Sequence, residues 1–390
     1  MSAQPPLVIS GLPLLNPYVG LGTYTLRLIR GLAKNGRVPF QVLVPQTAES
    51  ALALLPPGIA VIVPGGVPKQ TPSLIQLLYW MDRVASFATG NHPNAIFHSP
   101  GSFWSRLHPA HTVVTLHDCI YREFPFYLGR YPFRRWLAGA TERYAAHAEA
   151  VLTVSEFSAR ELHERAGIPA GKIRAIHQGI EDRFSPENAR QEAGAVRAKY
   201  NLPARFLLYL GGYDYRKNVE FLIAAYALAK KQGPLPPLVL AGSVPTRVDR
   251  TLCDVHGALR RAGLAVGADV FLPGLIADAD MPGLYGAAEM LVYPSRYEGF
   301  GLPPAEAMAA GTPVLVADNT SLREVVPAPR NRFSLDQPET LARLLAEACA
   351  DPGKFLVPLD PRHEEAAAIE EYLQVLAGIF PGIPLTPAAR

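Results

Sequence analysis

Cysteine is scarce in this sequence. Three cysteines occur among 390 residues, and Cys119, Cys253 and Cys349 lie far apart in the chain. This small odd number excludes a framework of disulfides and argues against a structural zinc site, since both need clustered cysteines. We therefore expect free thiols and a reducing compartment such as the cytosol.

Long stretches of one residue kind are also missing. No block of Lys and Arg occurs and the net charge is only +3, so we expect no nucleic-acid partner. No apolar run reaches the ~18 residues that span a bilayer. The first residues lack the basic start and apolar stretch of a secretory signal. These absences predict a cytoplasmic protein, with any membrane contact peripheral and at the inner face of the plasma membrane.

What the chain does contain is a regular alternation of short apolar runs and amphipathic helical stretches. Apolar strands separated by helices are typical of parallel sheets that helices cover on both faces. The predicted strands are Leu7–Ser10, Phe40–Val44, Ala60–Val63, Ala95–Ser99, Thr112–Leu116, Val151–Val154, Ile173–Ile176, Arg205–Leu210, Pro237–Leu240, Val270–Leu272, Met290–Tyr293 and Pro313–Ala317.

The pattern restarts in the middle of the chain, which predicts two facing, doubly wound α/β domains of the Rossmann type. The first domain covers residues 1–190 and the second covers residues 200–360. The polar segment Glu181–Asn201 shows no clear periodicity and is interpreted as a linker. A final helix at 364–380 is predicted to pack back on the first domain. Ligands of such sheets bind at the carboxyl ends of the strands.

The stretch Pro294–Pro313 carries the strongest sign of a ligand site. It follows a predicted strand, turns through Gly299 and Gly301, and enters a helix with Glu306 in its first turn. Backbone amides at a helix N-terminus favour an anion. Seven residues separate Glu298 from Glu306, and two carboxylates beside an anion site suit a polyol that carries a phosphate. The alternative is a solvated Glu298 and a Glu306 that only complements the helix dipole.

Arg216 and Lys217 form a second candidate site. They follow a predicted strand and Gly211-Gly212, and precede a helix. The helix dipole disfavours cations at its N-terminus, so their placement there favours a function. An adjacent guanidinium and ammonium can hold a diphosphate.

Two further candidates lie in the first half. Gly20 and Gly22 precede a helix predicted at Thr23–Lys34, but Thr25 replaces the third glycine of a dinucleotide fingerprint, and no acid ends the second strand. Nicotinamide binding is therefore disfavoured, whereas a phosphate or a sugar is compatible. His117 and Asp118 end a strand, where they can contact a ligand or exchange a proton; a purely structural histidine is the alternative.

Two other patterns allow both a functional interpretation and a purely structural one. Asp278-Ala-Asp280 is a DxD sequence, which in another fold binds a metal and a nucleotide. Since a helix starts immediately afterwards, Asp280 is more simply an N-cap. The segment Phe124–Trp136 mixes aromatic residues with arginines, so it suits a lipid-linked acceptor or an anionic membrane, or else a helix with one packed aromatic face.

Taken together, these residues resemble the family 4 retaining glycosyltransferases of the GT-B fold, and in particular bacterial mannosyltransferases. The resemblance runs over roughly residues 20–345. Each motif is weak alone, and their shared order makes the resemblance specific. The motifs are Gly20–Gly22, His117-Asp118, Ala150–Arg160, Lys172–Gly179, Arg216-Lys217 and Glu298–Glu306 with its flanks.

The resemblance implies transfer of a hexose from a nucleotide diphosphate donor to an acceptor, with retained configuration and no essential metal. Arg216 and Lys217 would neutralise the leaving diphosphate. Glu298 would bind the donor hexose and Glu306 the ribose. Donor oxygens would meet the backbone of the two glycine segments, namely Gly20, Gly22, Gly299, Phe300, Gly301 and Leu302.

The remaining implied roles concern the base, the reacting sugar and the partners. Leu275 and Ile276 would hold the base, His117 would contact the donor sugar, and Asp118 would orient His117 or the acceptor. We expect mannose from GDP-mannose and an acceptor that is a glycan or a lipid-linked saccharide, in polysaccharide biosynthesis. The alternatives are a UDP-hexose donor and, from another class of enzyme, a GT-B sugar-nucleotide epimerase.

Overall fold

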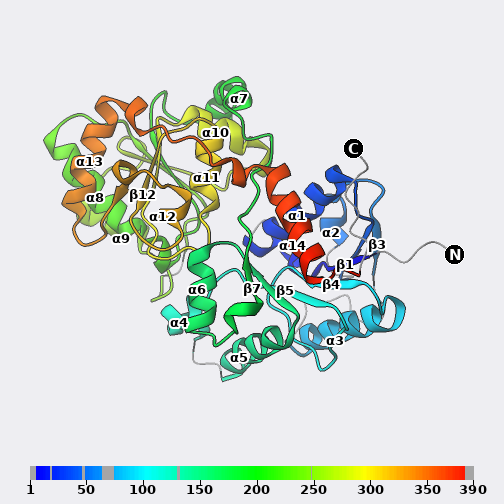
Figure 1. Ribbon diagram of the computed structural model, residues 1–390. Coiled ribbons are helices and arrows are strands. Elements are labelled where there is room, and N and C mark those ends of the chain that lie inside the picture. Colours follow the sequence, from blue (N-terminus) through cyan, green and yellow to red (C-terminus); the bar gives the residue numbers. More distant parts are fainter. Residues whose placement is uncertain are drawn as a thin grey trace. The chain divides into compact units, whose positions relative to one another are not determined.

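A computed structural model describes residues 6–17, 20–45, 49–63, 74–129, 132–246 and 248–382. The chain divides into two compact units (Figure 1). One unit combines residues 1–179 with residues 365–390, and the other comprises residues 180–364.

The first unit is built on a parallel sheet. Its described strands run in the order β3-β2-β1-β4-β5-β6-β7. The strands are β1 (Leu7–Ser10), β2 (Phe40–Leu43), β3 (Ala60–Ile62), β4 (Ile96–Ser99), β5 (Thr112–Thr115), β6 (Ala150–Thr153) and β7 (Ile173–Ala175). The helices are α1 (Gly20–Asn35), α2 (Glu49–Leu52), α3 (Leu74–Asn91), α4 (Ile120–Glu123), α5 (Pro132–His147), α6 (Glu156–Glu164) and α14 (Glu365–Ile379).

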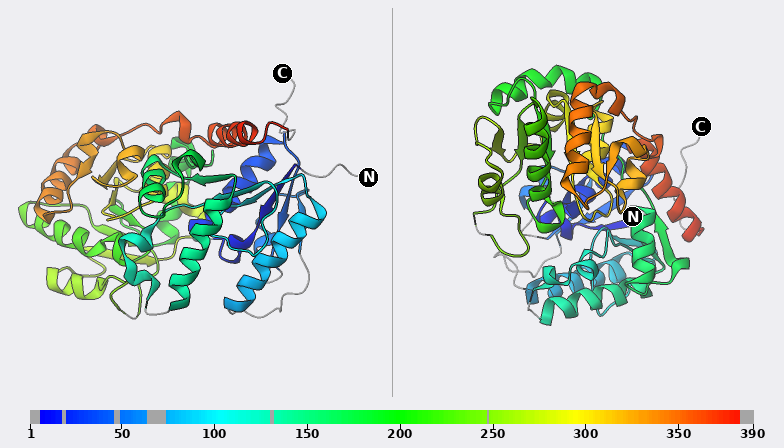
Figure 2. Two further views of the ribbon diagram at one scale, coloured as in Figure 1. Left: turned by 60° about the horizontal axis from the view of Figure 1, so that its bottom comes forward. Right: turned by 90° about the vertical axis from the view of Figure 1, so that its left-hand side faces the viewer.

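The first sheet is buried on both faces, which explains why its strands are apolar throughout. Successive side chains of a strand point to opposite faces. In β1, Leu7 and Ile9 pack in the cluster of α1 and α14, whereas Val8 packs in the cluster of α3, α5 and α6. Figures 1 and 2 show these helices on the two sides of the sheet. A strand with two buried faces carries no polar alternation.

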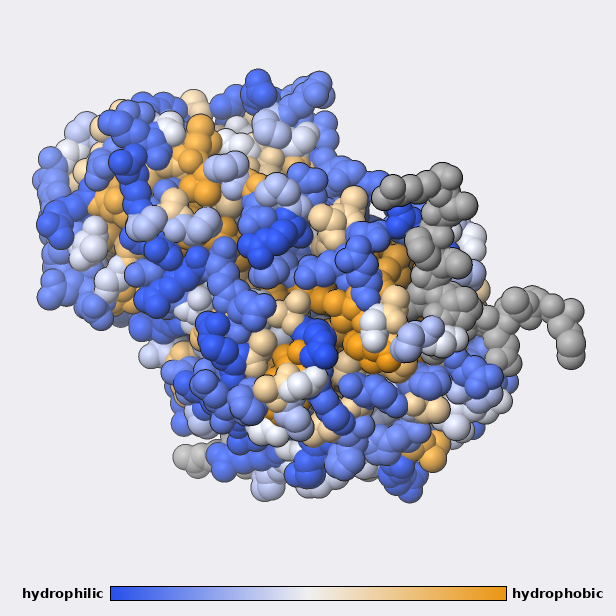
Figure 3. All heavy atoms as spheres, in the orientation of Figure 1, coloured by the Kyte–Doolittle hydropathy of each residue, from blue (hydrophilic) through white to orange (hydrophobic). Residues whose placement is uncertain are grey.

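The helix α14 belongs to the first unit although it comes last in the sequence. Ile369 lies over Gly31 of α1, where an added Cβ would stand 2.6 Å from its Cγ1. The Tyr372 hydroxyl lies 2.8 Å from Nδ1 of the buried His98 in β4. Lys34 of α1 pairs with Glu365 at 2.8 Å. Apolar side chains also reach the surface beside α14 (Figure 3).

The second unit has its own parallel sheet. Its described strands run in the order β10-β9-β8-β11-β12-β13. The strands are β8 (Leu207–Leu210), β9 (Leu238–Ala241), β10 (Val270–Gly274), β11 (Met290–Tyr293), β12 (Val314–Ala317) and β13 (Arg332–Phe333). The helices are α7 (Pro186–Lys199), α8 (Val219–Gln232), α9 (Val255–Ala262), α10 (Met281–Ala287), α11 (Leu302–Ala309), α12 (Leu322–Val325) and α13 (Pro338–Ala350).

The predicted fold class is confirmed, and each predicted strand is present within two residues at its ends. The short strand β13 was not predicted. The three cysteines are free, as expected. Burial raises the pKa of Cys119 to about 12 and that of Cys349 to about 11, and it also raises the pKa of Cys253.

The prediction of a linker at Glu181–Asn201 is wrong, because most of this segment is the helix α7. Ser185 caps α7 by accepting a hydrogen bond from the Asn188 amide at 3.2 Å, and Pro186 follows at the first helical position. The buried face of α7 consists of small residues, Ala189, Ala193 and Val196. Since the second unit begins at Ile180, α7 lies wholly inside it.

Two glycines of α10 allow α7 to approach closely. A Cβ on Gly286 would lie 2.2 Å from the Ala189 carbonyl oxygen, and one on Gly283 would lie 2.6 Å from Val196. Both contacts are far inside van der Waals distance. The sequence therefore forms a tight pair of helices from small side chains rather than from a broad apolar stripe.

We predict that Gly286→Ala destabilises the second unit by about 1–3 kcal/mol, because the helices must separate. Gly194 also lies within α7, but an added Cβ there meets nothing within 4 Å. As the matched control, Gly194→Ala should stabilise the protein by about 1 kcal/mol, the usual helical gain over glycine. Urea unfolding of both variants checks this; equal effects at the two positions would contradict the close packing.

Candidate active site

The candidate site of the second unit lies where the strand order reverses. From β8 the chain proceeds through β9 to β10 on one side, and β11 begins on the other side of β8. The loops after β8 and β11 therefore diverge from neighbouring strands at the carboxyl edge of the sheet. Such a switch point is where parallel α/β sheets bind ligands. These two loops carry Arg216, Lys217 and Glu298.

The Glu298 carboxylate is the centre of this site. One oxygen accepts hydrogen bonds from Lys217 Nζ at 2.7 Å and Ser295 Oγ at 2.6 Å. The other oxygen accepts one from an Arg216 guanidinium nitrogen at 2.7 Å. Glu298 is 7% exposed and Lys217 is 8% exposed. The structure thus brings all three predicted residues into one ion cluster, in which Glu298 and Lys217 are buried and Arg216 is partly exposed.

Burial opposes ionisation of Glu298, but the charges of Arg216 and Lys217 outweigh burial and lower the pKa of this carboxyl to about 2. Burial and the Arg216 charge lower the pKa of Lys217, while Glu298 counteracts that shift. The carboxylate therefore compensates two cations that stand side by side.

Further residues hold the cations in position. The Lys217 ammonium also donates to the Tyr293 hydroxyl, and it lies 4.9 Å from the centre of that ring. Arg216 Nε pairs with Asp214 at 3.1 Å. Both cations sit in a 3₁₀ turn, Tyr215–Lys217, which ends at Asn218 with φ 56°. The cations therefore precede α8 by one turn rather than standing on it.

The predicted glycine turn and helix N-terminus follow Glu298. Gly301 has φ 107°, in the region that only glycine adopts easily, and α11 begins at Leu302. Pro303 and Pro304 carry no amide hydrogen, so the donors at this helix start are the amides of Gly301 and Leu302. Phe300 is buried against His363, with ring centroids 5.3 Å apart.

Glu306 stands apart from the ion cluster. It lies beyond the first turn of α11, one turn later than predicted, because the helix begins at Leu302. Glu306 is 7% exposed, and its carboxylate accepts a hydrogen bond from the Tyr285 hydroxyl at 2.6 Å. A buried carboxylate with a polar partner is more than a solvated complement to the helix dipole.

Leu275 and Ile276 follow β10, at the edge of the same sheet. Leu275 is 74% exposed, whereas Ile276 is buried. An exposed leucine is the simplest surface against which a planar base can pack, so the predicted position remains open to a ligand.

The predicted N-cap role of the Asp280 side chain is wrong, because that side chain caps no amide of α10. It accepts hydrogen bonds from Lys199 and the Tyr200 hydroxyl at 2.6 Å each. Asp278 pairs with Arg183 at 2.8 Å. Both carboxylates of the DxD thus bind cations at or beside α7. Across the described part of the chain, no three His, Cys, Asp or Glu side chains gather as a metal site would need.

In the first unit, the predicted helix start at Thr23 is wrong, because the helix begins three residues earlier, at Gly20. Gly20 and Gly22 form the first turn of α1. A Cβ on Gly22 would lie 2.0 Å from the Asn16 carbonyl oxygen, whereas one on Gly20 would meet nothing within 4 Å. Glycine is needed at position 22 because the chain's own backbone passes there.

His117 is half-buried after β5. Its Nε2 lies 3.1 Å from the Pro100 carbonyl, and its ring meets the Tyr24 ring edge-on at 4.5 Å. Burial lowers the pKa of His117, although the Pro100 carbonyl and Asp118 work against that shift. Asp118 accepts a hydrogen bond from the Ile120 amide at 3.1 Å, which fastens the start of α4.

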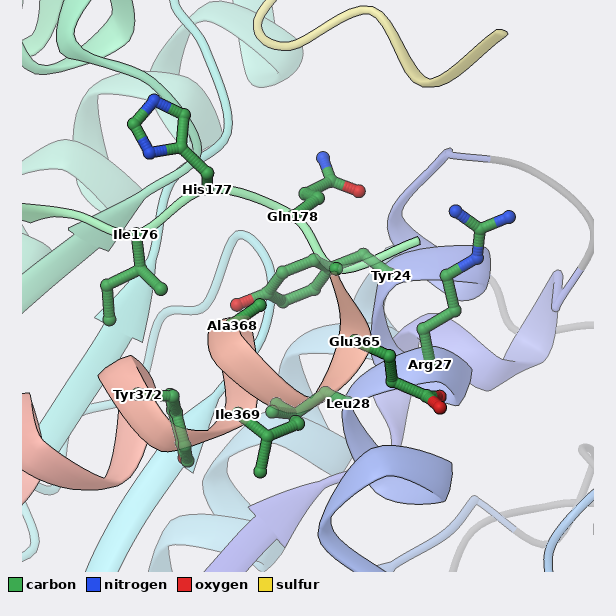
Figure 4. Close-up of a pocket in the computed structure, with 11 residues that line it drawn as sticks. Tyr24, Arg27, Leu28, Ile176, His177, Gln178, Glu365, Ala368, Ile369 and Tyr372 are labelled. Carbon is green, nitrogen blue, oxygen red and sulfur yellow. The ribbon is translucent and has the colours of Figure 1, made fainter. Parts of the chain in front are cut away.

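A small cavity lies in the first unit between α1, α14 and the segment after β7. Its volume is about 40 Å³, room for a few water molecules. Figure 4 shows the polar ends of Arg27, His177 and Gln178 extending to the same side of Tyr24. The Gln178 carboxamide oxygen makes no hydrogen bond among the described residues. The sequence did not mark Arg27, and it marked His177 and Gln178 only as part of the motif Lys172–Gly179.

Sequence reasoning also missed the supporting residues of the ion cluster. The sequence marks Tyr293 only as the end of a predicted strand, and Ser295 and Asp214 only as loop residues. One signal was present for Ser295, since it stands three residues before Glu298 in the same turn. No comparable signal marks the pairing of Tyr293 with Lys217, because it depends on which strands are neighbours.

The low pKa of Glu298 predicts an acid-dependent stability. The carboxyl has an unfolded pKa of about 4.3. Its ionised form therefore contributes fully above that pH, and this contribution is lost as the pH falls towards 2, by roughly 3 kcal/mol in total. Glu298→Gln should be less stable than the native protein at pH 7, and the difference should shrink between pH 5 and 3.

Urea unfolding at pH 7, 5, 4 and 3 measures this difference. The exposed Glu339 on α13 provides the matched control. Glu339→Gln should stay within about 1 kcal/mol of the native protein at every pH, the usual contribution of an exposed acid in the first turn of a helix. A stability gap for Glu298→Gln that stayed constant down to pH 3 would mean that the ion cluster does not hold Glu298 ionised.

The two halves of the chain match two protein families. Residues 18–184 match Glycosyltransferase Family 4, and residues 195–368 match Glycosyl transferases group 1. The chain is 30% identical over 336 residues to the O-antigen chain mannosyltransferase B of Escherichia coli, covering 80% of this chain and 82% of that protein.

Two other relatives share a shorter region. Over 253 residues the chain is 30% identical to the serotype-specific mannosyltransferase WbdA of Escherichia coli, covering 63% of this chain but only 30% of that protein. Over 254 residues it is 27% identical to a GDP-mannose-dependent alpha-(1-6)-phosphatidylinositol dimannoside mannosyltransferase of Mycobacterium tuberculosis, covering 64% of this chain and 62% of that protein.

Among solved structures, sucrose-phosphate synthase from Thermosynechococcus elongatus aligns with a TM-score of 0.68. The alignment covers 96% of this chain and 95% of the other at 22% identity, which is a likeness of fold. The two family matches, the long alignment with mannosyltransferase B and this likeness lead to one conclusion. The chain belongs to glycosyltransferase family 4 and has the GT-B fold.

Proposed function

We propose that this glycosyltransferase moves mannose from GDP-mannose to a glycan or lipid-linked saccharide, with retained anomeric configuration. The observation that carries the proposal is the ion cluster of Arg216, Lys217 and Glu298 at the switch point of the second sheet. The names of three relatives favour mannose, and one of these names includes GDP-mannose. A UDP-hexose is the alternative donor.

The ion cluster suits the departure of a nucleoside diphosphate. Two cations stand next to each other, and in the free protein Glu298 and Asp214 balance them. Negative charge develops on the diphosphate as the sugar leaves, and a guanidinium with an adjacent ammonium stabilises such charge. Because the cations are already held in place, they need little rearrangement when the donor binds.

The same cluster supports a reaction without an essential metal. Two side-chain cations supply the positive charge that a divalent ion would otherwise bring to the diphosphate. The DxD carboxylates, which would be the first candidates as ligands, are engaged by Arg183, Lys199 and Tyr200.

His117 is proposed to accept a hydrogen bond from a sugar hydroxyl. Burial lowers its pKa, so the imidazole is neutral at pH 7. Its Nε2 faces the Pro100 carbonyl, which can only accept, so Nε2 carries the proton. Nδ1 is then the acceptor of the ring. Asp118 is proposed to steady this loop through its bond to the Ile120 amide.

We predict that, in EDTA, the protein releases GDP from GDP-mannose when an acceptor is added. We further predict that Lys217→Ala and Glu298→Ala each reduce transfer at least about 100-fold, equivalent to ~3 kcal/mol of barrier. The first variant loses charge opposite the diphosphate, and the second loses the group that orients both cations. Initial rates of GDP release measure transfer, and NMR of the product gives its anomeric configuration.

Lys230→Ala is the matched control, because Lys230 is also an ion-paired lysine of the second unit, bound to Asp269. It should transfer at the native rate. Turnover of a UDP-hexose instead of GDP-mannose would mean that the proposed donor is wrong and that the protein is still a glycosyltransferase. A changed sugar without transfer would indicate an epimerase. Near-native transfer by Lys217→Ala would show that the ion cluster is not the active site.

A peripheral membrane contact is proposed for the first unit, where the predicted aromatic and basic segment is partly exposed. Trp136 on α5 and Leu107 are each 43% exposed, and the Trp104 and Trp136 rings lie 5.5 Å apart. The exposed Arg134 and Arg135 directly precede Trp136. Exposed tryptophan with neighbouring arginines suits an anionic lipid surface. Arg130 lies outside the described residues, and no described helix is long and apolar enough to cross a membrane.

We predict that the protein sediments with vesicles containing anionic phospholipid and not with neutral ones. Arg135→Gln should weaken this binding about fivefold, since a basic residue near the surface contributes about 1 kcal/mol. Leu356 of the second unit is 52% exposed, and the control Leu356→Ser should bind like the native protein. Equal binding to neutral and anionic vesicles would contradict the proposed contact.

A further inference from the structure

The loop that carries Glu298 is held by three consecutive side chains of a different loop. Asn319, Thr320 and Ser321 follow β12, the neighbour of β11 in the sheet. Tyr293 at the end of β11 is paired with Val316 of β12. The two loops therefore leave the sheet beside each other.

Asn319 binds the start of the Glu298 loop. Its side-chain Nδ2 donates towards the carbonyl oxygens of Ser295 and Arg296, at 3.0 and 3.2 Å. Its Oδ1 accepts a hydrogen bond from Thr320 Oγ1 at 3.1 Å. Because an amide has distinct donor and acceptor ends, this arrangement requires Asn319 in one orientation.

Ser321 binds the other end of the loop. Its hydroxyl lies 2.9 Å from the Glu298 carbonyl oxygen and 2.8 Å from that of Phe300. The Ser321 side chain is fully buried. Buried carbonyl groups need donors, and residues 294–301 belong to no described strand, in which neighbouring strands would supply them.

Thr320 sits between these two residues in an unusual backbone conformation. Its φ is 45°, which is strained for a β-branched residue. Its hydroxyl lies 3.4 Å from the Glu298 amide nitrogen. Such strain persists only where neighbouring contacts impose it, and here the bonds of Asn319 and Ser321 do so.

We propose that Asn319, Thr320 and Ser321 act as a positioning clamp for the Glu298 loop. They bind backbone groups at both ends of the loop, so they determine where the Glu298 carboxylate and the Gly301 and Leu302 amides stand. None of the three needs to touch the donor. The effect on transfer rests on the proposed function, whereas the effect on the loop does not.

Loss of a clamp and loss of a merely structural contact change different measurable properties of the protein. A structural contact lowers the stability of the second unit and leaves the rate constants of the folded enzyme unchanged. A clamp changes the mobility of residues 295–302 in the folded protein and the catalytic efficiency. Small displacements of catalytic groups reduce rates by as much as about 100-fold.

The test uses substitutions that separate these contributions. Asn319→Asp keeps the shape and the Oδ1 acceptor but loses both donated bonds. Ser321→Ala removes one hydroxyl and is the milder change should Asn319→Asp fold poorly. Thr320→Ala removes both the hydroxyl and the β-branch, whereas Thr320→Ser removes the β-branch alone and retains the hydroxyl. The control Ser334→Ala removes a hydroxyl that donates to Asp336 and not to the Glu298 loop.

Hydrogen exchange of residues 295–302 in the free protein is the first readout. We expect exchange at least about fivefold faster in Asn319→Asp and Ser321→Ala, and native exchange in Ser334→Ala. The second readout is transfer, for which kcat/KM should fall about 10- to 100-fold in these two variants. Thr320→Ser should restore most of what Thr320→Ala loses.

Failure of the proposed function can be distinguished from failure of the clamp. If the native protein transfers no sugar from any nucleotide donor, the proposed function fails, and hydrogen exchange still decides whether the clamp exists. Native exchange together with kcat/KM within about twofold of the native value, in both Asn319→Asp and Ser321→Ala, would overturn the clamp.

Discussion

The central constraint of this structure is a carboxylate that is buried yet ionised. Glu298 can remain charged only because Arg216 and Lys217 bind it, and Lys217 in turn is buried only because Glu298 compensates it. Removing either partner of a buried ion pair leaves an uncompensated charge, which is strongly destabilising. The three residues therefore form one unit, and the loops that carry them must keep their relative positions.

Parallel sheets explain how residues so distant in sequence come together. All described strand pairs of the second sheet are parallel, so the loops after β8, β11 and β12 emerge at one edge. Each loop has a different task there. The first supplies cations, the second supplies the carboxylate and amides, and the third holds the backbone of the second. This division also explains why many polar side chains at this edge are buried although none belongs to an apolar core.

Sequence patterns were most informative where one segment determines its own structure. The strands were predictable because a strand with two buried faces is a continuous apolar run, and the site loops because they follow such runs. The helix α7 was missed since its buried face is alanine and valine, and its stability depends on glycines about ninety residues later. The close packing of Gly22, the partners of Asp280 and the pairing of Tyr293 with Lys217 were missed for the same reason. Each depends on a contact with a segment whose position only the fold determines.

The three thiols have a practical consequence beyond the site. Reactivity of cysteine requires thiolate and access to solvent, and the raised pKa values of Cys119, Cys253 and Cys349 keep them protonated at neutral pH. A cysteine introduced on an exposed helix would therefore react with a maleimide reagent well before the native ones. Spectroscopic probes can accordingly be attached to either unit in a background that retains all of its natural cysteines.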